Sequence, residues 1–324
     1  MDKNKYVIQW HITHLCNLRC KHCYQEEYNN HMKREDFYMI LDRIEDYLAD
    51  KSLYPQINLT GGEPLLHPDF FEFLEEIVKR KIRFSILTNG TMIDKGIAKK
   101  IKDYNPIFVQ ISLDGTKDTH DSIRGEGNFE KALEGIDNLK EQGVKVLVSF
   151  TAQKSNYTEF KDLAKICKKH NVDKLWWDRV VTDDNNLYLS TDEFKELVLN
   201  CNTLIHSFHP FQRYDFVSNQ RSLQCLGTED CGYHCSAGKG LIIILADGSV
   251  MPCRRLPFVI GNIKENSLSE IIHNSHLMKE LSDFYAPKEC YGCKDLNRCY
   301  GGSRCVTYAQ TGKLYKKDIN CFAK

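Results

Sequence analysis

The sequence predicts an α/β protein: a partial, TIM-like (β/α)6 barrel followed by a small, cysteine-rich C-terminal domain. Two observations indicate this fold class. Short apolar runs alternate six times with longer amphipathic stretches in the first part of the chain. The alternation then stops, and nine of the 14 cysteines fall in the last hundred residues. Strand and helix alternation predicts a parallel sheet with right-handed crossovers. Because there are six such units rather than eight, we expect an open, curved barrel.

Six strands are expected in the barrel, since their runs are short, apolar and bounded by turn residues. They span residues 6–13, 56–60, 83–89, 106–115, 145–152 and 174–181. The stretches between them carry apolar residues at spacings of three and four, which predicts amphipathic helices. These helices span residues 34–50, 68–81, 94–104, 128–143 and 157–171. In parallel α/β folds, the functional loops follow the carboxyl ends of the strands.

Changes in composition along the chain predict three segments. They are the barrel at 1–184, a mostly helical bridge at 185–224 and the cysteine-rich domain at 225–324. Within the last segment, the run 241–250 predicts a β-hairpin, and 267–281 predicts a helix. The rest consists of glycine-punctuated cysteine loops with little apolar content. Because such a tail buries too little apolar surface to fold alone, we expect bound metal to stabilise it.

Composition excludes several classes of partner and compartment. Lys plus Arg and Asp plus Glu both number 44, so no net charge favours nucleic acid or an anionic membrane as a partner. No secretory segment and no run of about 20 apolar residues is present. We therefore expect a cytoplasmic protein with no nucleic-acid and no membrane partner. In a reducing compartment, 14 cysteines indicate metal binding or catalysis rather than disulfides.

Three cysteines are crowded into the stretch HLCNLRCKHCYQ, near the start of the chain. Cys16, Cys20 and Cys23 follow the first expected strand directly. A structural zinc site requires four ligands, whereas three thiolates on one loop suit a cubic iron-sulfur cluster with one iron left open. A zinc loop completed by His14 or His22 is the alternative.

The C-x3-C-x2-C spacing of these cysteines resembles the signature of the radical S-adenosylmethionine (radical SAM) superfamily. The resemblance implies a 4Fe-4S cluster whose open iron binds SAM. It also implies reductive cleavage of SAM to a 5'-deoxyadenosyl radical, which abstracts a hydrogen from an unactivated C–H bond. The protein's part would be binding, orientation and the exclusion of competing reactions.

Two further motifs extend the resemblance. LTGGEP, at the end of the second strand, is similar to the family's SAM-binding loop, which implies cofactor-binding roles for Gly61, Gly62 and Glu63. Glycine suits a loop whose backbone must approach a ligand closely. ISLDG, followed by HDSIRG, is similar to the segment in which Ser112 would contact the ribose and Arg124 would pair with the SAM carboxylate. A guanidinium matches a carboxylate by forming two parallel hydrogen bonds.

The cysteine-rich tail resembles the SPASM domain, which usually holds two auxiliary iron-sulfur clusters. The resemblance therefore implies three 4Fe-4S clusters in all, with 2Fe-2S as an alternative at one auxiliary site. It assigns the first auxiliary cluster to Cys231, Cys235, Cys253 and Cys305. It assigns the second to Cys290, Cys293, Cys299 and Cys321. Interleaving the two ligand sets would tie the tail into one unit. Two zinc ribbons are the alternative.

One position departs from the family pattern. Ser303 stands where a thiol is commonly found, and we expect Cys305, two residues later, to substitute for it. Cys225 has no assigned role. It could replace Cys231 as a ligand, donate a proton, or be a buried thiol.

Several other residues have open or structural interpretations. Cys167 and Cys201 lie on expected amphipathic helices, where buried thiols behave as small hydrophobic side chains. Asp178 and Arg179 end the sixth strand and are candidates for contact with SAM or substrate. The sequence assigns no catalytic residue.

Known members of the SPASM subgroup act chiefly on peptides, so a peptide maturase that forms a crosslink or another oxidative modification is the leading hypothesis. A tetrapyrrole or other small-molecule precursor is the next. Sulfatase maturation is disfavoured, because Arg254 follows Cys253 where those enzymes have an aspartate base. A non-catalytic iron-sulfur or zinc protein is the alternative outside enzymes.

The resemblance also implies partners beyond the substrate. We expect an electron donor such as a flavodoxin or ferredoxin. The first motif begins at Cys16, which leaves no room before it for a leader-binding domain. A separate leader-binding protein, or grip by the barrel and tail themselves, is therefore expected.

Overall fold

The computed structural model describes residues 5–25, 27–49, 51–205, 215–218, 235–283 and 286–322. Its strands form one sheet in the order β10-β9-β8-β1-β2-β3-β4-β5-β6-β7. The strands are β1 (Lys5–His11), β2 (Tyr54–Thr60), β3 (Arg83–Thr88), β4 (Val109–Ser112), β5 (Val146–Ala152), β6 (Lys174–Arg179), β7 (Val217–Ser218), β8 (Leu241–Ile244), β9 (Ser249–Met251) and β10 (Gly261–Asn262). All neighbours from β1 to β7 pair in parallel.

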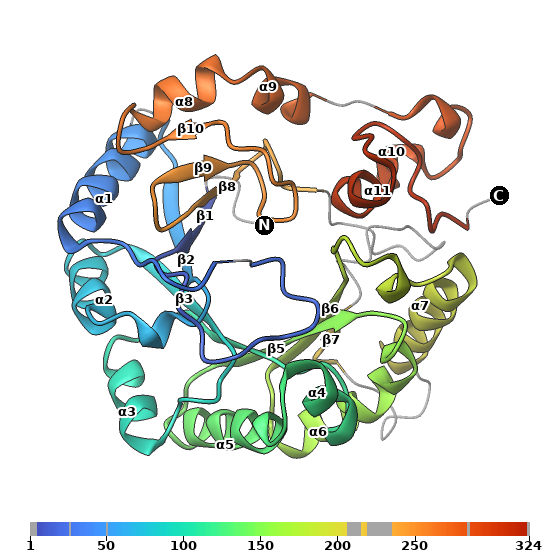
Figure 1. Ribbon diagram of the computed structural model, residues 1–324, viewed down its shortest axis with the longest axis horizontal. Coiled ribbons are helices and arrows are strands. Elements are labelled where there is room, and N and C mark those ends of the chain that lie inside the picture. Colours follow the sequence, from blue (N-terminus) through green and yellow to red (C-terminus); the bar gives the residue numbers. More distant parts are fainter. Residues whose placement is uncertain are drawn as a thin grey trace.

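Helices cover the outer face of this curved sheet, and the tail lies across its open side (Figure 1). The α-helices are α1 (Arg34–Ala49), α2 (Phe70–Lys79), α3 (Lys95–Asp103), α4 (Lys117–Arg124), α5 (Asn128–Glu141), α6 (Phe160–Lys169), α7 (Thr191–Ile205), α8 (Leu268–Asn274), α9 (His276–Ser282), α10 (Leu296–Cys299) and α11 (Arg304–Thr311). Short 3-10 turns are η1 (Pro64–Leu66), η2 (Tyr157–Glu159), η3 (Asn185–Leu187) and η6 (Lys288–Cys290). No helix in the described part of the chain is both long and apolar enough to span a membrane.

The six expected barrel strands and the five expected helices between them are confirmed. β5 illustrates how they pack, because its residues alternate strictly between buried and half-buried. The side chains of Val146, Val148 and Phe150 point to the helices and are fully buried. Those of Ser149 and Thr151 point to the other face and line a cavity. The inner face of the barrel is thus partly polar, as a binding cavity requires.

The residues of β6 alternate in the same way. Trp177 is fully buried on the helix side, where its ring contacts Phe160 and Phe194. Trp176 and Asp178 line the cavity instead.

Two helical features differ from the prediction. α4 was not predicted, because it buries only His120 and Ile123 and has no apolar stripe. The helix predicted over 267–281 is interrupted at Ser275. The extended backbone of Ser275 and its side-chain cap on Met278 N begin a second helix.

The tail is continuous with the barrel sheet rather than separate from it. The predicted hairpin forms as β8 and β9, and β8 pairs in parallel with β1, with Val7 opposite Leu241. This pairing covers what would otherwise be an exposed sheet edge. Of the predicted helical bridge, α7 is confirmed, whereas 206–214 and 219–224 lie outside the described residues.

Candidate active site

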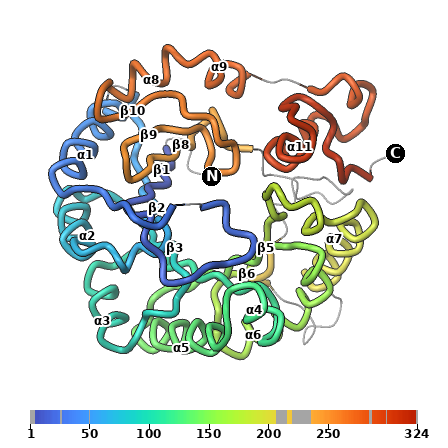
Figure 2. The backbone as a smooth tube through the Cα atoms, viewed as in Figure 1, coloured from blue at the N-terminus to red at the C-terminus, as the bar shows by residue number. Residues whose placement is uncertain are grey.

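The three cysteines of the opening motif line one wall of a cavity of about 580 Å³. They lie on residues 14–25, here called the cysteine loop, which follow β1; this part of the chain crosses the middle of the barrel arc (Figure 2). Backbone N–H groups donate to two of the sulfurs. Leu18 N lies 3.4 Å from Cys16 Sγ, and Gln25 N lies 3.4 Å from Cys23 Sγ. At Cys16 burial raises the pKa of the thiol to about 11, which outweighs the lowering of this pKa by the backbone donor.

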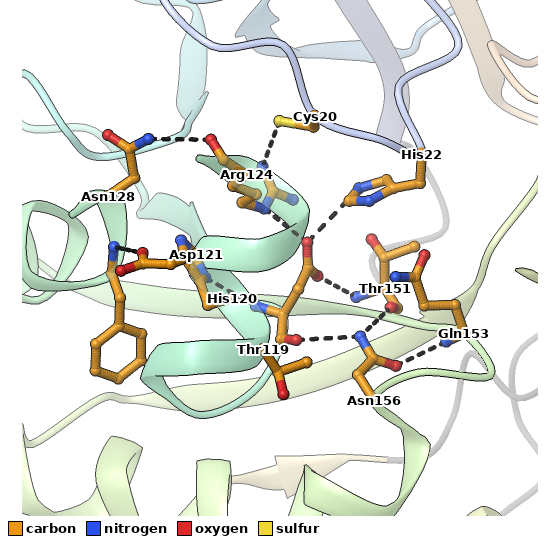
Figure 3. A network of polar contacts seen from close by, with 12 residues as sticks. Cys20, His22, Thr119, His120, Asp121, Arg124, Asn128, Thr151, Gln153 and Asn156 are labelled. Carbon is orange, nitrogen blue, oxygen red and sulfur yellow. Dashed lines mark hydrogen bonds and ion pairs between the residues drawn. The ribbon is translucent and has the colours of Figure 1, made fainter. Parts of the chain in front are cut away.

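Arg124 provides a donor for the third sulfur. Its Nη1 lies 3.8 Å from Cys20 Sγ (Figure 3), and its Nε donates to Asp114 Oδ2 at 2.6 Å. Arg124 ends α4 and also lines the cavity. It therefore connects the cysteine loop to the segment after β4. Three thiols on one loop, each with a donor and all facing a cavity, fit a cluster with an open coordination position.

Asp114 is the centre of a buried network that the sequence analysis missed. Besides Arg124, it accepts a hydrogen bond from Thr151 N at 2.8 Å, and His22 Nε2 lies 3.6 Å away. Burial raises the pKa of the Asp114 carboxyl, but Arg124 and His22 outweigh burial and bring this pKa below its usual value. A charged Asp114 thus orients Arg124. The available signal was its position in ISLDG, at the carboxyl end of the fourth expected strand.

Gly61 and Gly62 line the cavity and lie against the backbone of the cysteine loop. A Cβ on Gly61 would lie 2.4 Å from Thr13 O, and one on Gly62 would lie 2.3 Å from Leu15 O. Gly62 N also donates to Thr13 O at 2.8 Å. The glycines are therefore required for contact between two loops, whatever their role toward a ligand.

Gly62→Ala is expected to displace the cysteine loop, because rigid backbone cannot yield to the added methyl group. Overpacking of this kind costs about 1–3 kcal/mol, so urea unfolding of the variant should have a lower midpoint and iron loading of the loop should fall. The matched control is Gly96→Ala on an exposed turn of α3, where a Cβ comes no nearer than 3.3 Å to Asp94 Oδ1. Equal unfolding midpoints for the two variants would contradict this account of the glycines.

Glu63 lies behind the cavity wall rather than on it. Its side chain is fully buried and accepts hydrogen bonds from Thr88 Oγ1 at 2.7 Å and Asn89 N at 2.8 Å. Burial raises its pKa to about 7. In the described structure this carboxylate connects the loop after β2 to the end of β3. Its predicted contact with the cofactor stays a prediction.

The register of the sheet brings the remaining barrel candidates to one level. Ser112 at the end of β4 is opposite Ser149, and Thr151 is opposite Asp178. The side chains of all four residues line the cavity. The Arg255 side chain reaches this wall from the tail, donating to Asp178 Oδ2 and, at 2.6 Å, to the carbonyl oxygen of Arg179. This contact between barrel and tail was not predicted.

The tail cysteines fall into two groups in the described residues. Burial first, and then the neighbouring Cys305 and Cys235, raise the pKa of the Cys253 thiol to about 12. Burial and then the neighbouring Cys321 and Cys293 raise the pKa of Cys290. The two groups are therefore Cys235, Cys253 and Cys305, and Cys290, Cys293 and Cys321. The interleaved assignment, which stays a prediction, gives the first group to one auxiliary cluster and the second group to the other; Cys299 lies at the end of α10. Cys225 and Cys231 lie outside the described residues.

Ser303 and Cys305 lie together where the sequence departs from the family pattern. Ser303 Oγ and Cys305 Sγ are 3.3 Å apart, and both side chains are buried.

Among the described residues, no three His, Cys, Asp or Glu side chains are arranged to hold a single metal ion.

The two cysteines with structural interpretations are buried as expected. Cys167 lies on α6 and Cys201 on α7, and Trp177 Nε1 donates to Cys201 Sγ at 3.3 Å. Neither residue lines the cavity.

Comparison with known proteins identifies two domains in the chain and several relatives similar to it. Residues 10–167 match the model of the radical SAM superfamily, and 235–294 match that of an iron-sulfur cluster-binding domain called SPASM. The chain is 28% identical to Fe-coproporphyrin III synthase of Methanosarcina barkeri, over 98% of this chain and 88% of that protein. It is 29% identical to the antilisterial bacteriocin subtilosin biosynthesis protein AlbA of Bacillus subtilis, over 97% of this chain and 70% of that protein.

A solved structure shares the fold along nearly the whole chain. Native anSMEcpe with bound AdoMet and Cp18Cys peptide superposes with a TM-score of 0.81, at 22% identity, over 98% of this chain and 94% of that one. The family match implies SAM and a 4Fe-4S cluster as cofactors, and the tail match implies auxiliary iron-sulfur clusters. The chain therefore contains a radical SAM domain over residues 10–167 and a SPASM-type iron-sulfur cluster-binding domain over 235–294.

Proposed function

We propose that this radical SAM enzyme abstracts a hydrogen from a peptide and completes an oxidation that forms a crosslink or a related modification. The observation that carries the proposal is the extent of the cavity wall, which reaches from the cysteine loop to Arg255. Arg255 is the second residue after Cys253, a proposed ligand of the first auxiliary cluster. A substrate in this cavity would lie between the site of radical formation and an electron acceptor.

The reaction type follows from this placement. Removal of one hydrogen atom leaves a carbon radical, and formation of a new bond at that carbon then requires loss of one more electron and one proton. An oxidised iron-sulfur cluster is the class of group that accepts the electron. Four protein thiolates on each auxiliary cluster would leave no iron open to substrate, which favours electron transfer over direct ligation.

The residues of the barrel would bind and orient the reactants. When bound at the three loop cysteines, a 4Fe-4S cluster with SAM on its open iron supplies the electron that cleaves SAM and yields the 5'-deoxyadenosyl radical. Arg124, oriented by Asp114, would pair with the SAM carboxylate, and the hydroxyl of Ser112 would contact the ribose. Gly61 and Gly62 would present backbone groups to the amino group.

A peptide substrate is supported by the likeness to AlbA, a protein of bacteriocin biosynthesis. We further propose a cytoplasmic location, a flavodoxin or ferredoxin as electron donor, and a separate leader-binding protein. Sulfatase maturation is not favoured, because Arg254 takes the place of the aspartate base.

A tetrapyrrole substrate is the second candidate. Fe-coproporphyrin III synthase covers nearly the whole chain in the comparison. In addition, the described cavity wall is rich in cationic side chains, which suit the carboxylates of such a molecule. The cations are Lys5, Arg124, Lys174 and Arg255, against one carboxylate, Asp178.

The test is a comparison of two substrates under identical anaerobic conditions. The reconstituted enzyme is incubated with SAM and dithionite, either with synthetic peptides encoded beside its gene or with a set of carboxylated iron tetrapyrroles, because iron coproporphyrin III itself is named as the product of the relative. We expect the peptide to lose two hydrogens by mass spectrometry, in proportion to the 5'-deoxyadenosine formed. Consumption of a tetrapyrrole with unchanged peptides would replace the peptide proposal with the tetrapyrrole one. Zinc in place of iron in the reconstituted protein would favour a non-catalytic binding protein.

A further inference from the structure

Asp318 is buried between the two groups of tail cysteines and the barrel. It is 2% exposed, and Arg179, at the end of β6, is 4% exposed. Arg179 Nη1 donates to Asp318 Oδ1 at 2.8 Å, and Nη2 donates to Oδ2 at 2.7 Å. This is a two-point ion pair across 139 residues of sequence, and Arg179 itself lines the cavity.

The same carboxylate also holds the backbone beside both cysteine groups. Ser303 N donates to Asp318 Oδ2 at 2.7 Å, and Asn320 N donates to Oδ1 at 3.0 Å. Ser303 is in turn 3.3 Å from Cys305 Sγ, while Cys321 N donates to the carbonyl oxygen of Asp318 at 2.9 Å. One side chain therefore contacts the segments that carry Cys305, of the first group, and Cys321, of the second.

Further contacts attach the segment around Asp318 to the barrel. Asn320 Nδ2 donates to Leu189 O at 2.9 Å, and Arg179 lies over the ring of Phe194 at 4.4 Å. The carbonyl oxygen of Arg179 accepts from Arg255 at 2.6 Å, close to Cys253 in the chain. The contacts of Asp318 and Arg179 thus extend from the cavity wall to both groups of cysteines.

We propose that Asp318 is a positioning residue that, through Arg179, fixes both auxiliary clusters relative to the substrate cavity. This rests on the auxiliary ligands assigned under the proposed function. Electron transfer depends on how the acceptor is placed, so a displaced tail would alter the auxiliary clusters without changing the SAM-binding loop. Asp318 does not line the cavity and contacts none of the residues assigned to SAM.

Asp318→Asn is a sharp test, because each carboxylate oxygen accepts two donors. Asparagine keeps the shape but has only one carbonyl oxygen, so its NH2 group must face two donors. We expect amide hydrogen exchange in residues 313–322 to become about tenfold faster. In the dithionite-reduced holoenzyme, the electron paramagnetic resonance signals of the auxiliary clusters should change, while that of the SAM-binding cluster and SAM cleavage without substrate should stay.

The control and a second variant keep the test decisive. Asp173→Asn removes a carboxylate that likewise accepts from a cation, Lys140, and a backbone group, Val146 N, but far from the tail. It should leave the auxiliary signals unchanged. Arg179→Lys keeps the charge but has fewer hydrogen-bond donors, so it should change the signals of the auxiliary clusters less than Asp318→Asn does. It also provides a readout if Asp318→Asn folds poorly.

Unchanged auxiliary signals in Asp318→Asn, or equal changes in the control, would overturn the proposal. So would a change confined to the SAM-binding cluster. These outcomes are separate from failure of the proposed function, which would appear in the wild type as peptides that stay unchanged while SAM is cleaved.

Discussion

Replacing Cys16, Cys20 and Cys23 with alanine is expected to abolish 5'-deoxyadenosine formation and to remove one cluster. The three sulfurs share a cavity wall, and each has a hydrogen-bond donor. Without them, no protein ligand would hold the iron that binds SAM. Iron per chain should fall from about 12 to about 8, as four irons leave with a cubic cluster. Both quantities are measured after anaerobic reconstitution, by iron analysis and by chromatography of the nucleoside.

The control for loss of a thiol as such is Cys167→Ala, on the buried face of α6. Because Cys167 acts as a small hydrophobic side chain, this variant should keep its iron and its SAM cleavage at a modest cost in stability. If the triple variant cleaves SAM as fast as the wild type, the assignment of the radical-forming site is wrong.

The double variant Cys290→Ala, Cys293→Ala is expected to separate SAM cleavage from product formation. These thiols lie in the tail, outside the cavity wall, so the cysteine loop and Arg124 should be unaffected. Loss of the second auxiliary cluster removes about four irons per chain. We expect 5'-deoxyadenosine to form within about threefold of the wild-type rate. Product per 5'-deoxyadenosine should fall at least about tenfold, because the second auxiliary cluster can no longer take part in the later oxidation. A tenfold fall in rate corresponds to about 1.4 kcal/mol in barrier height.

The measurement is the ratio of modified peptide to 5'-deoxyadenosine in the same reaction. Loss of both activities in parallel would mean that the tail is needed for folding of the barrel rather than for the later oxidation. Retention of both would remove the second auxiliary cluster from the mechanism.

The sequence predicted the barrel well because buried parallel strands have a local signature. The apolar runs that became β1 to β6 are recognisable within a few residues, and the amphipathic helices between them have a regular period. α4 was missed because it lacks such a signature: KDTHDSIR buries only His120 and Ile123. The break at Ser275 was missed because the serine that caps α9 lies within a continuous helical pattern, and the pattern alone predicts that the helix continues.

The site was predicted in part, and mostly through the family resemblance. The cysteine spacing pointed to Cys16, Cys20 and Cys23 directly. Contacts across the chain, such as Arg124 with Asp114 and Cys20, have no local signature and required the folded structure. The pairing of Arg179 with Asp318, 139 residues away, is the extreme case. For Glu63 the motif predicts a cofactor contact, which stays a prediction, and the folded structure adds that its carboxylate joins two loops.

The central claim is that the cluster on the cysteine loop leaves one iron open and that SAM binds to it. Electron-nuclear double resonance of the reduced enzyme, with SAM isotopically labelled in its amino and carboxylate groups, tests this most directly. Our account predicts hyperfine coupling between the cluster and both labelled groups, and loss of that coupling in the triple cysteine variant. A cluster signal without coupling to either group, in enzyme saturated with SAM, would contradict it.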